Sequence, residues 1–195
     1  MSGPALIRLA ALCAALGALA PAASAETLDL PHGLSVQLPE GWVVDGSPQG
    51  EVSRSGMRRV QLVCASEACE QTQETCTLLM QAKPLEGDDD DARLQALYAS
   101  PLKRYFRLRA VLRATSPDAD IRRPLERVRI GDRDWYRVET DARHQYRSGL
   151  FAETVVDDLY VGAICKSCET GEQRHLDGLR IIESLKSTAK ATTAR

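Results

Sequence analysis

LFAETVVDDLYVGAI, residues 150–164, is the stretch that decides the fold class, because it predicts a β-hairpin. Its two apolar runs, Leu150–Val156 and Leu159–Ile164, are separated only by Asp157-Asp158. Two turn-forming residues between two such runs are typical of a tight turn between antiparallel strands. We therefore expect a largely antiparallel sheet around this hairpin.

Further strand patterns lie on both sides of the hairpin. Leu34–Leu38 alternates apolar and polar residues, which indicates a half-buried strand. The remaining strands are predicted at 42–44, 58–64, 76–83, 125–130 and 135–140, and a polar loop is predicted at 65–75. After the hairpin we expect a helix over 171–185, because Thr170 and Gln173 have the spacing of a capping box. Its predicted buried face consists of Leu176, Leu179, Ile182 and Leu185.

A helical region is predicted at about 90–113. Pro101 should break or kink it, since proline has no N–H to donate and clashes with the preceding turn. The apolar residues share one face before the proline and form a broad apolar face after it: Leu94, Leu97 and Tyr98, then Leu102, Tyr105, Phe106, Leu108 and Leu112. Few helices beside many antiparallel strands predict an α+β fold, with helices flanking a largely antiparallel sheet.

The first 25 residues have the pattern of a secretory leader. Arg8 precedes an apolar run that is too short to span a bilayer, and small residues end at a predicted cleavage site after Ala25. We expect export to the periplasm or beyond, a single domain over 26–186, and a disordered tail over 187–195. The predicted mature chain has 24 basic and 27 acidic residues, a net charge of −3, which does not suggest a nucleic-acid binder. It contains no second apolar run long enough for a membrane span.

Five cysteines follow the leader: Cys64, Cys69, Cys76, Cys165 and Cys168. In an oxidising compartment most of them should form disulfides, so two bridges and one free thiol are expected. The spacing leaves fifteen connectivities open. A bridge from the first three cysteines to the last two would close a loop of about ninety residues and contribute roughly 4–5 kcal/mol.

The motif Cys165-Lys-Ser-Cys168 raises an alternative function. It follows a predicted strand and precedes a helix, where thiolates are stabilised in redox proteins. With the earlier cysteines it also resembles a zinc site, although the spacings are long for one. A structural role in disulfides is the simpler interpretation, because too little chain follows Cys168 to complete a thioredoxin-like domain.

The sequence offers no constellation for catalysis. Nucleophile-elbow and zinc-protease motifs are absent. His32, His144 and His175 are isolated, so we predict surface or half-buried histidines and neither a metal site nor a cofactor. Asp88–Asp91 lacks the spacing of a calcium loop and is better explained as favourable charge at a helix N-terminus. These patterns predict a protein that is not an enzyme.

Residues 101–130 form the most basic part of the chain, with nine basic and three acidic side chains. Lys103, Arg104 and Arg107 are predicted on one helix face, and we regard them as candidate contacts to a protein partner with an acidic surface. Anionic lipids are an alternative ligand for the same patch. The face can also be merely solvated, with its charge balanced by Asp88–Asp91.

Two segments resemble the PsbP-like family. They are LSVQLPEGW (residues 34–42) and the chain end, where a strand, a cysteine and a helix closing in IIESLK (residues 181–186) follow one another. The resemblance implies a central antiparallel sheet flanked by helices over roughly Leu28 to Lys186. Family members include photosystem accessory proteins, nuclear transport factors and bacterial envelope or secretion accessory proteins, which bind partners without catalysis. Together with the absence of a catalytic constellation, the expected disulfides and the uneven charge, this leads us to expect an exported protein-binding module, such as an immunity or an envelope or secretion accessory protein.

Overall fold

The hairpin at 150–164 lies at the centre of the main sheet. Strands β9 (Ser148–Val156) and β10 (Leu159–Ser167) pair antiparallel, with Leu159 opposite Val156. Asp157 and Asp158 between them have φ values of 49° and 66°, the left-handed conformations that a two-residue hairpin turn requires.

The structure is a computed structural model that describes residues 25–172 and 174–188. Residues 1–24 of the predicted leader and residues 189–195 of the predicted tail therefore lie outside the described residues.

The main sheet is antiparallel throughout the described chain, as predicted. Its strand order is β3-β5-β6-β10-β9-β8-β7, with β4 also paired to β5. The other strands are β3 (Trp42–Asp45), β4 (Glu51–Val52), β5 (Arg58–Cys64), β6 (Thr75–Ala82), β7 (Asp120–Ile130) and β8 (Arg133–Asp141). β7 is longer than predicted, because its first residues pair with β8 across register shifts on both sides of Arg123.

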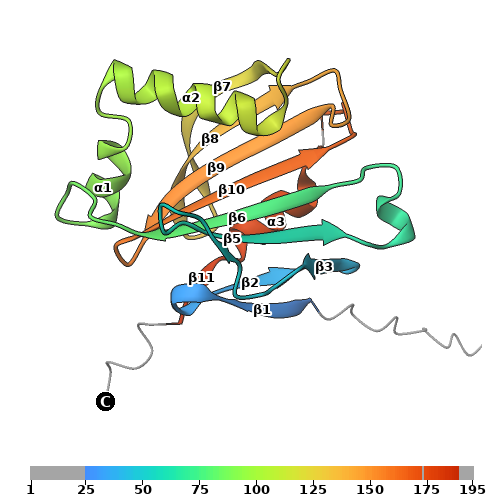
Figure 1. Cartoon of the computed structure of the whole chain (residues 1–195), viewed down its shortest axis with the longest axis horizontal. Coiled ribbons are helices and arrows are strands. Elements are labelled where there is room, and N and C mark those ends of the chain that lie inside the picture. The colour runs from blue at the N-terminus through green and yellow to red at the C-terminus, as the bar shows by residue number, and fades with distance from the viewer. Residues whose placement is uncertain (1–24, 173, 189–195) are drawn as a thin grey trace, which may run out of the picture.

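A small sheet and one helix cover one face of the main sheet. The small sheet has the order β1-β2-β11, formed by β1 (Glu26–Leu30), β2 (Leu34–Leu38) and β11 (Lys186–Ser187). The small sheet lies below the main sheet in Figure 1, and helix α3 (Leu176–Glu183) lies behind the main sheet. Their apolar side chains form the largest core cluster together with Trp42, Leu62 and Trp135. Because Ser187 pairs with Leu34, the ordered chain continues past residue 186.

Two helices cover the other face, α1 (Asp90–Ala96) and α2 (Pro101–Thr115) (Figure 1). The predicted break at Pro101 is confirmed, and the proline occupies the first turn of α2, where its missing N–H removes no helical bond. Asp89 caps α1 by accepting from Ala92 N, and Ser100 caps α2 by accepting from Lys103 N. Within the described residues no helix has the length and apolarity to cross a bilayer.

The last helix is shorter than the sequence predicts. It begins at Leu176, because His175 adopts a left-handed conformation (φ 61°) that interrupts a helix. Thr170 therefore lies outside the helix, and the predicted capping box does not start it. Leu176 is also exposed rather than buried, whereas Ile181 and Ile182 face the core.

Candidate functional site

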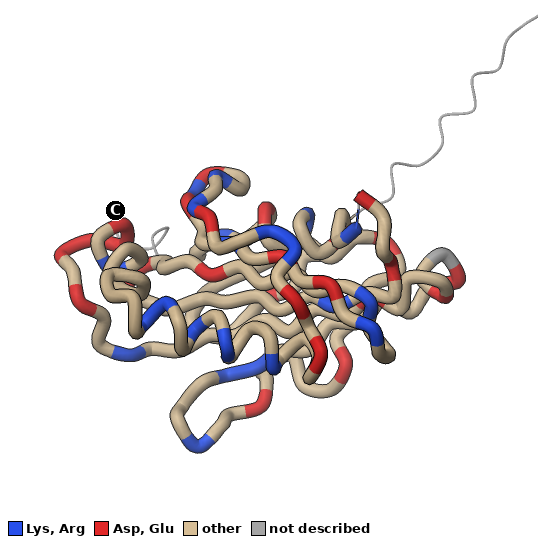
Figure 2. Tube along the Cα trace, turned by 90° about the horizontal axis from the view of Figure 1, so that it is seen from above, with Lys and Arg blue, Asp and Glu red and all other residues tan. Residues whose placement is uncertain are grey.

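Helix α2 carries charge of a single sign. Its sequence PLKRYFRLRAVLRAT contains five basic residues and no acidic residue. Elsewhere the two signs are interspersed along the trace, as the blue and red segments of Figure 2 show. α2 is therefore a local exception in a chain whose overall net charge is close to zero.

The outer face of α2 is apolar as well as basic. We use this name for Leu102, Tyr105, Phe106, Arg109 and Arg113. Leu102, Tyr105 and Phe106 are 64%, 52% and 60% exposed. The sequence predicts these three on a broad apolar face of the helix, but the face that contacts the sheet is the i, i+4 row of Arg107, Val111 and Thr115. Leu108 and Leu112, which flank that row, are half-buried.

The predicted basic trio does not share one outward face. Lys103 Nζ lies 3.1 Å from Glu86 Oε2, and Arg104 Nε donates to the carbonyl of Tyr98 at 2.8 Å. Arg107 turns toward the sheet and contacts Glu153. Each of the three thus has a local partner within the described chain, and Arg109 and Arg113 are the basic side chains of the helix on its outer face.

Arg107 and Glu153 form the centre of a buried polar cluster. Glu153 is fully buried on β9, and Arg107 Nη1 donates to both of its carboxylate oxygens, at 2.8 and 2.6 Å. Tyr160 Oη donates to the same carboxylate at 2.8 Å. The Arg107 guanidinium also lies 5.4 Å from the ring centre of Tyr98 and 5.7 Å from that of Tyr160. The cluster holds Arg107 in place under α2.

The same contacts move the pKa values of the cluster. Burial raises the pKa of both tyrosines above the usual value, and the negative charge of Glu153 raises it further. Burial by itself disfavours the charged form of Arg107, but the carboxylate of Glu153 and the interactions with Tyr160 and Tyr98 together outweigh it and raise the pKa. At neutral pH the cluster is therefore one ion pair with two neutral phenols.

A groove of about 460 Å³ opens beside this cluster, between α1, α2 and the segment that follows β6. We call it the α2 groove. Its lining includes four cationic side chains and one carboxylate, with apolar side chains between them: Lys83, Pro84, Leu85, Glu86, Arg93, Ala96, Leu97, Lys103, Phe106 and Arg107. Phe106 connects the groove to the outer face of α2. Basic and apolar groups thus meet on one continuous surface.

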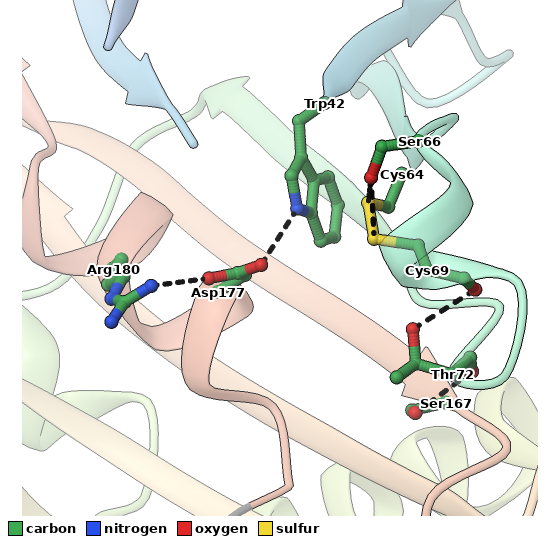
Figure 3. The surroundings of a disulfide bond; sticks show 8 residues. All are labelled: Trp42, Cys64, Ser66, Cys69, Thr72, Ser167, Asp177 and Arg180. Carbon is green, nitrogen blue, oxygen red and sulfur yellow. Dashed lines mark hydrogen bonds and ion pairs between the residues drawn. A yellow bond between two sulfur atoms is a disulfide. The ribbon is translucent and has the colours of Figure 1, made fainter. Parts of the chain in front are cut away.

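The cysteines form two disulfides in the structure, Cys64–Cys69 and Cys76–Cys165, and Cys168 keeps a free thiol. Cys76 and Cys165 are register partners on β6 and β10 and are fully buried. Cys64–Cys69 closes the loop beside Trp42 (Figure 3). In this pairing Cys165 is bonded to Cys76, so the two cysteines of the alternative thiol or zinc function do not form a thiol pair in the structure.

A second buried polar group, which the sequence did not reveal, lies at the start of α3. His175 is 1% exposed and its Nδ1 lies 3.3 Å from Glu74 Oε1. This corrects the prediction of a surface or half-buried histidine. Asp177 accepts a hydrogen bond from Trp42 Nε1 at 3.2 Å, as Figure 3 shows. The partners are separated by 101 and 135 positions in the chain, so no local pattern could have predicted them.

The predicted acidic helix start is confirmed in the fold. Asp89 caps α1, while Asp90 accepts from the amides of Asp157 and Asp158 at 2.9 and 3.2 Å. Asp91 pairs with Arg127. Among the described residues, no three histidine, cysteine, aspartate or glutamate side chains are arranged to hold a metal ion.

Comparisons with known proteins support the fold alone. No protein-family model matches the sequence, and no curated protein matches it. Among solved structures, the solution structure of cyanobacterial PsbP (CyanoP) from Synechocystis sp. superposes with a TM-score of 0.51 at 17% identity. The match covers 80% of this chain and 86% of the cyanobacterial chain. The expected resemblance is thereby confirmed at the level of architecture: the chain has a PsbP-like α+β fold.

Proposed function

We propose that this protein is an exported, non-catalytic binding module that contacts an acidic protein partner through the outer face of α2. One observation carries the proposal. Leu102, Tyr105 and Phe106 are each more than half exposed, on a helix whose charged side chains are all basic. Exposed apolar groups clustered with arginines are typical of protein interfaces, where aromatic residues and arginine are enriched.

The charge of α2 favours an acidic partner. Arg109 and Arg113 lie on the outer face, and Arg109 Nη1 donates to Tyr105 Oη at 3.1 Å with its guanidinium 5.6 Å from the tyrosine ring centre. This contact holds a planar cation beside an apolar surface. Arginine in such a position suits bidentate recognition of carboxylates.

Export is supported by two features of the chain. The first 25 residues have the pattern of a secretory leader. The structure also pairs four cysteines as disulfides, which persist in oxidising compartments. An immunity protein or an envelope or secretion accessory protein is the concrete role that we infer. Cell fractionation and N-terminal sequencing test the export, with Glu26 expected as the first residue.

The binding role is tested with two variants of the mature protein. The double variant Leu102→Ala/Tyr105→Ala removes apolar contact from the outer face, and Leu176→Ala removes a similarly exposed leucine from α3 on the other side of the main sheet. Tagged wild type first captures the partner from the envelope fraction of the producing cells, and mass spectrometry identifies it. The purified partner is then titrated calorimetrically.

We expect the outer-face double variant to weaken binding at least about tenfold, which corresponds to one interface hot spot of modest size. Leu176→Ala should bind like the wild type. Equal affinity of both variants for the same partner would contradict the proposed use of α2. Recovery of anionic lipid instead of protein on the wild type would contradict the proposed partner class.

A further inference from the structure

We propose that the α2 groove binds an acidic side chain of the partner, with a neighbouring apolar side chain packed beside Phe106. This inference rests on the proposed function and adds the chemistry that the partner presents. The groove has four cationic side chains in its lining, Lys83, Arg93, Lys103 and Arg107, against the single carboxylate of Glu86. The question is which of these charges is available to a ligand.

Three of the four cations already have carboxylate partners. Arg107 pairs with buried Glu153, and Arg93 pairs with Asp158 and Asp90. Lys103 pairs with Glu86 at 3.1 Å, where the two side chains are 48% and 82% exposed. Only the last pair is open to solvent on both sides, so its contribution is small and it can rearrange around a ligand.

Lys83 is the cation of the lining that forms no ion pair with a described residue. Across the parts of the chain that the structure describes, its ammonium is in contact with no carboxylate. It lies 4.9 Å from the centre of the Tyr160 ring, and the Arg107 guanidinium lies 5.7 Å from the same ring centre. Partial burial lowers the pKa of Lys83, the positive charge of Arg107 lowers it further, and the negative charge of Glu153 offsets part of this effect. A carboxylate placed in the groove would relieve this repulsion.

The ring that Lys83 contacts belongs to a buried side chain that is held by a hydrogen bond. Tyr160 Oη is held by Glu153 at 2.8 Å, and Glu153 is also bound by Arg107. The Tyr160 ring under Lys83 is therefore fixed, and the position of the ammonium is limited by its contact with that ring. A pre-positioned cation loses less side-chain entropy on binding than a free surface lysine.

The apolar part of the lining selects against a bare inorganic anion. Phe106 is 60% exposed, and Leu85, Leu97 and Pro84 complete the apolar lining. Such a lining gains binding energy from a side chain with apolar surface. An acidic residue followed by a leucine or phenylalanine in a partner segment supplies both groups.

The test uses a blocked synthetic peptide, Asp-Leu-Glu-Phe, titrated into isotope-labelled mature protein and followed by NMR. The amide analogue Asn-Leu-Gln-Phe is the matched peptide control, and inorganic phosphate and vesicles containing phosphatidylglycerol are the alternative anions. Lys83→Met removes the charge while retaining an unbranched side chain, and Lys83→Arg restores the charge. Glu86→Gln is the control for a charge change of the same size on the same segment.

We expect millimolar binding of the acidic peptide, with shift changes confined to Lys83–Leu85, Leu97 and Phe106. Lys83→Met should weaken it at least about fivefold, a loss of roughly 1 kcal/mol expected for one partly exposed ion pair. Lys83→Arg should retain binding, and Glu86→Gln should retain or tighten it. Unaltered backbone spectra of the variants away from the groove show that they are folded.

Several results would overturn the inference. These are equal binding of the acidic and amide peptides, unchanged binding by Lys83→Met, and no shift change at millimolar peptide. The inference would also be contradicted if phosphate or vesicles, but not the peptide, changed the shifts of Lys83–Leu85, Leu97 and Phe106. If the partner captured by the wild type is lost with Leu102→Ala/Tyr105→Ala but retained with Lys83→Met, the proposed function stands and the groove inference fails. If neither variant affects capture, both fail.

Discussion

Arg107 Nη1 lies 2.6 Å from Oε2 of Glu153, a carboxylate that is completely buried between α2 and the main sheet. A buried carboxylate is tolerated only when its charge is paired and hydrogen-bonded. Arg107 supplies the charge, and Tyr160 donates a second hydrogen bond to the same oxygen. A residue that the sequence suggested as a partner contact is thus needed to hold α2 on the sheet.

Removing Arg107 should therefore destabilise the protein strongly. Arg107→Met leaves Glu153 buried without its cation, and we expect the free energy of unfolding to fall by about 3 kcal/mol. Arg109→Met, on the exposed side of the same helix, should change it by less than about 0.5 kcal/mol. Chemical denaturation at neutral pH measures both, and equal stability of the two variants would disprove the structural role of Arg107.

The stability of the fold should decrease in alkali because of Tyr98 and Tyr160. Their pKa values are raised in the folded state by burial and by Glu153, so the folded protein keeps both protons when the unfolded chain has lost them. Their contribution is complete below the unfolded pKa of about 10 and is lost as the pH rises above it, by about 1.4 kcal/mol per pH unit for each tyrosine.

This pH dependence can be assigned to the buried tyrosines by substitution. Tyr98→Phe should reduce the alkaline slope of unfolding free energy against pH by about half, because one titrating group remains. Tyr105→Phe, on the exposed outer face, should leave the slope unchanged. An ultraviolet titration of the phenol groups gives an independent measurement, and ionisation of all tyrosines before unfolding would refute the prediction.

The two disulfides should differ in their contribution to stability. Cys76–Cys165 closes a separation of 89 residues, and the chain-entropy model assigns it about 4–5 kcal/mol. Cys64–Cys69 spans only 5 residues and should contribute about 2 kcal/mol. Double alanine variants of each pair, compared by denaturant unfolding, test the order. A larger loss for Cys64→Ala/Cys69→Ala would contradict it.

The disulfide pairing also predicts thiol reactivity. Native mature protein should react with one equivalent of a thiol reagent, at Cys168, which retains a free and partly exposed thiol. Cys168→Ser should remove the reaction entirely. Three or more reactive thiols in the native protein would show that at least one of the two described disulfides is absent.

Gly178 tests how tightly α3 packs on the central disulfide. A Cβ at this position would lie 2.8 Å from Cys165 Sγ and 3.1 Å from both Cys76 Sγ and Glu74 Oε1. Alanine favours a helix by roughly 1 kcal/mol over glycine, but overpacking a core typically costs about 1–3 kcal/mol. We expect Gly178→Ala to be destabilising on balance. Gly171→Ala, which meets no atom within 4 Å, should be nearly neutral, and thermal unfolding compares the two.

The local patterns in the sequence predicted the main elements correctly where a single residue or turn sets the backbone conformation. Asp157 and Asp158 adopt the left-handed conformations of a hairpin, and Pro101 separates two helices. Both effects depend only on neighbouring residues. The end of the chain was predicted less well, because the left-handed backbone of His175 is stabilised by burial against Glu74, which lies 101 residues earlier.

The candidate surface shows the same division. That α2 is basic and free of acidic residues can be read directly from residues 101–115. The side of α2 that faces the sheet cannot be read from the sequence, because apolar residues occur all round the helix and do not define one stripe. Arg107 is turned inward by Glu153, and Leu102, Tyr105 and Phe106 are consequently exposed.

The sequence by itself determined the antiparallel α+β class, the positions of most strands and helices, and the presence of five cysteines after residue 25. These properties follow from turn conformations, from the alternation of side chains and from counting. The tertiary structure alone decided that Cys165 bonds Cys76, that Arg107 pairs with Glu153, and that Lys83 lies in a groove against the Tyr160 ring. Such contacts join residues tens of positions apart, and they are selected by the register of the strands and by the energy of burying charge, which no local pattern records.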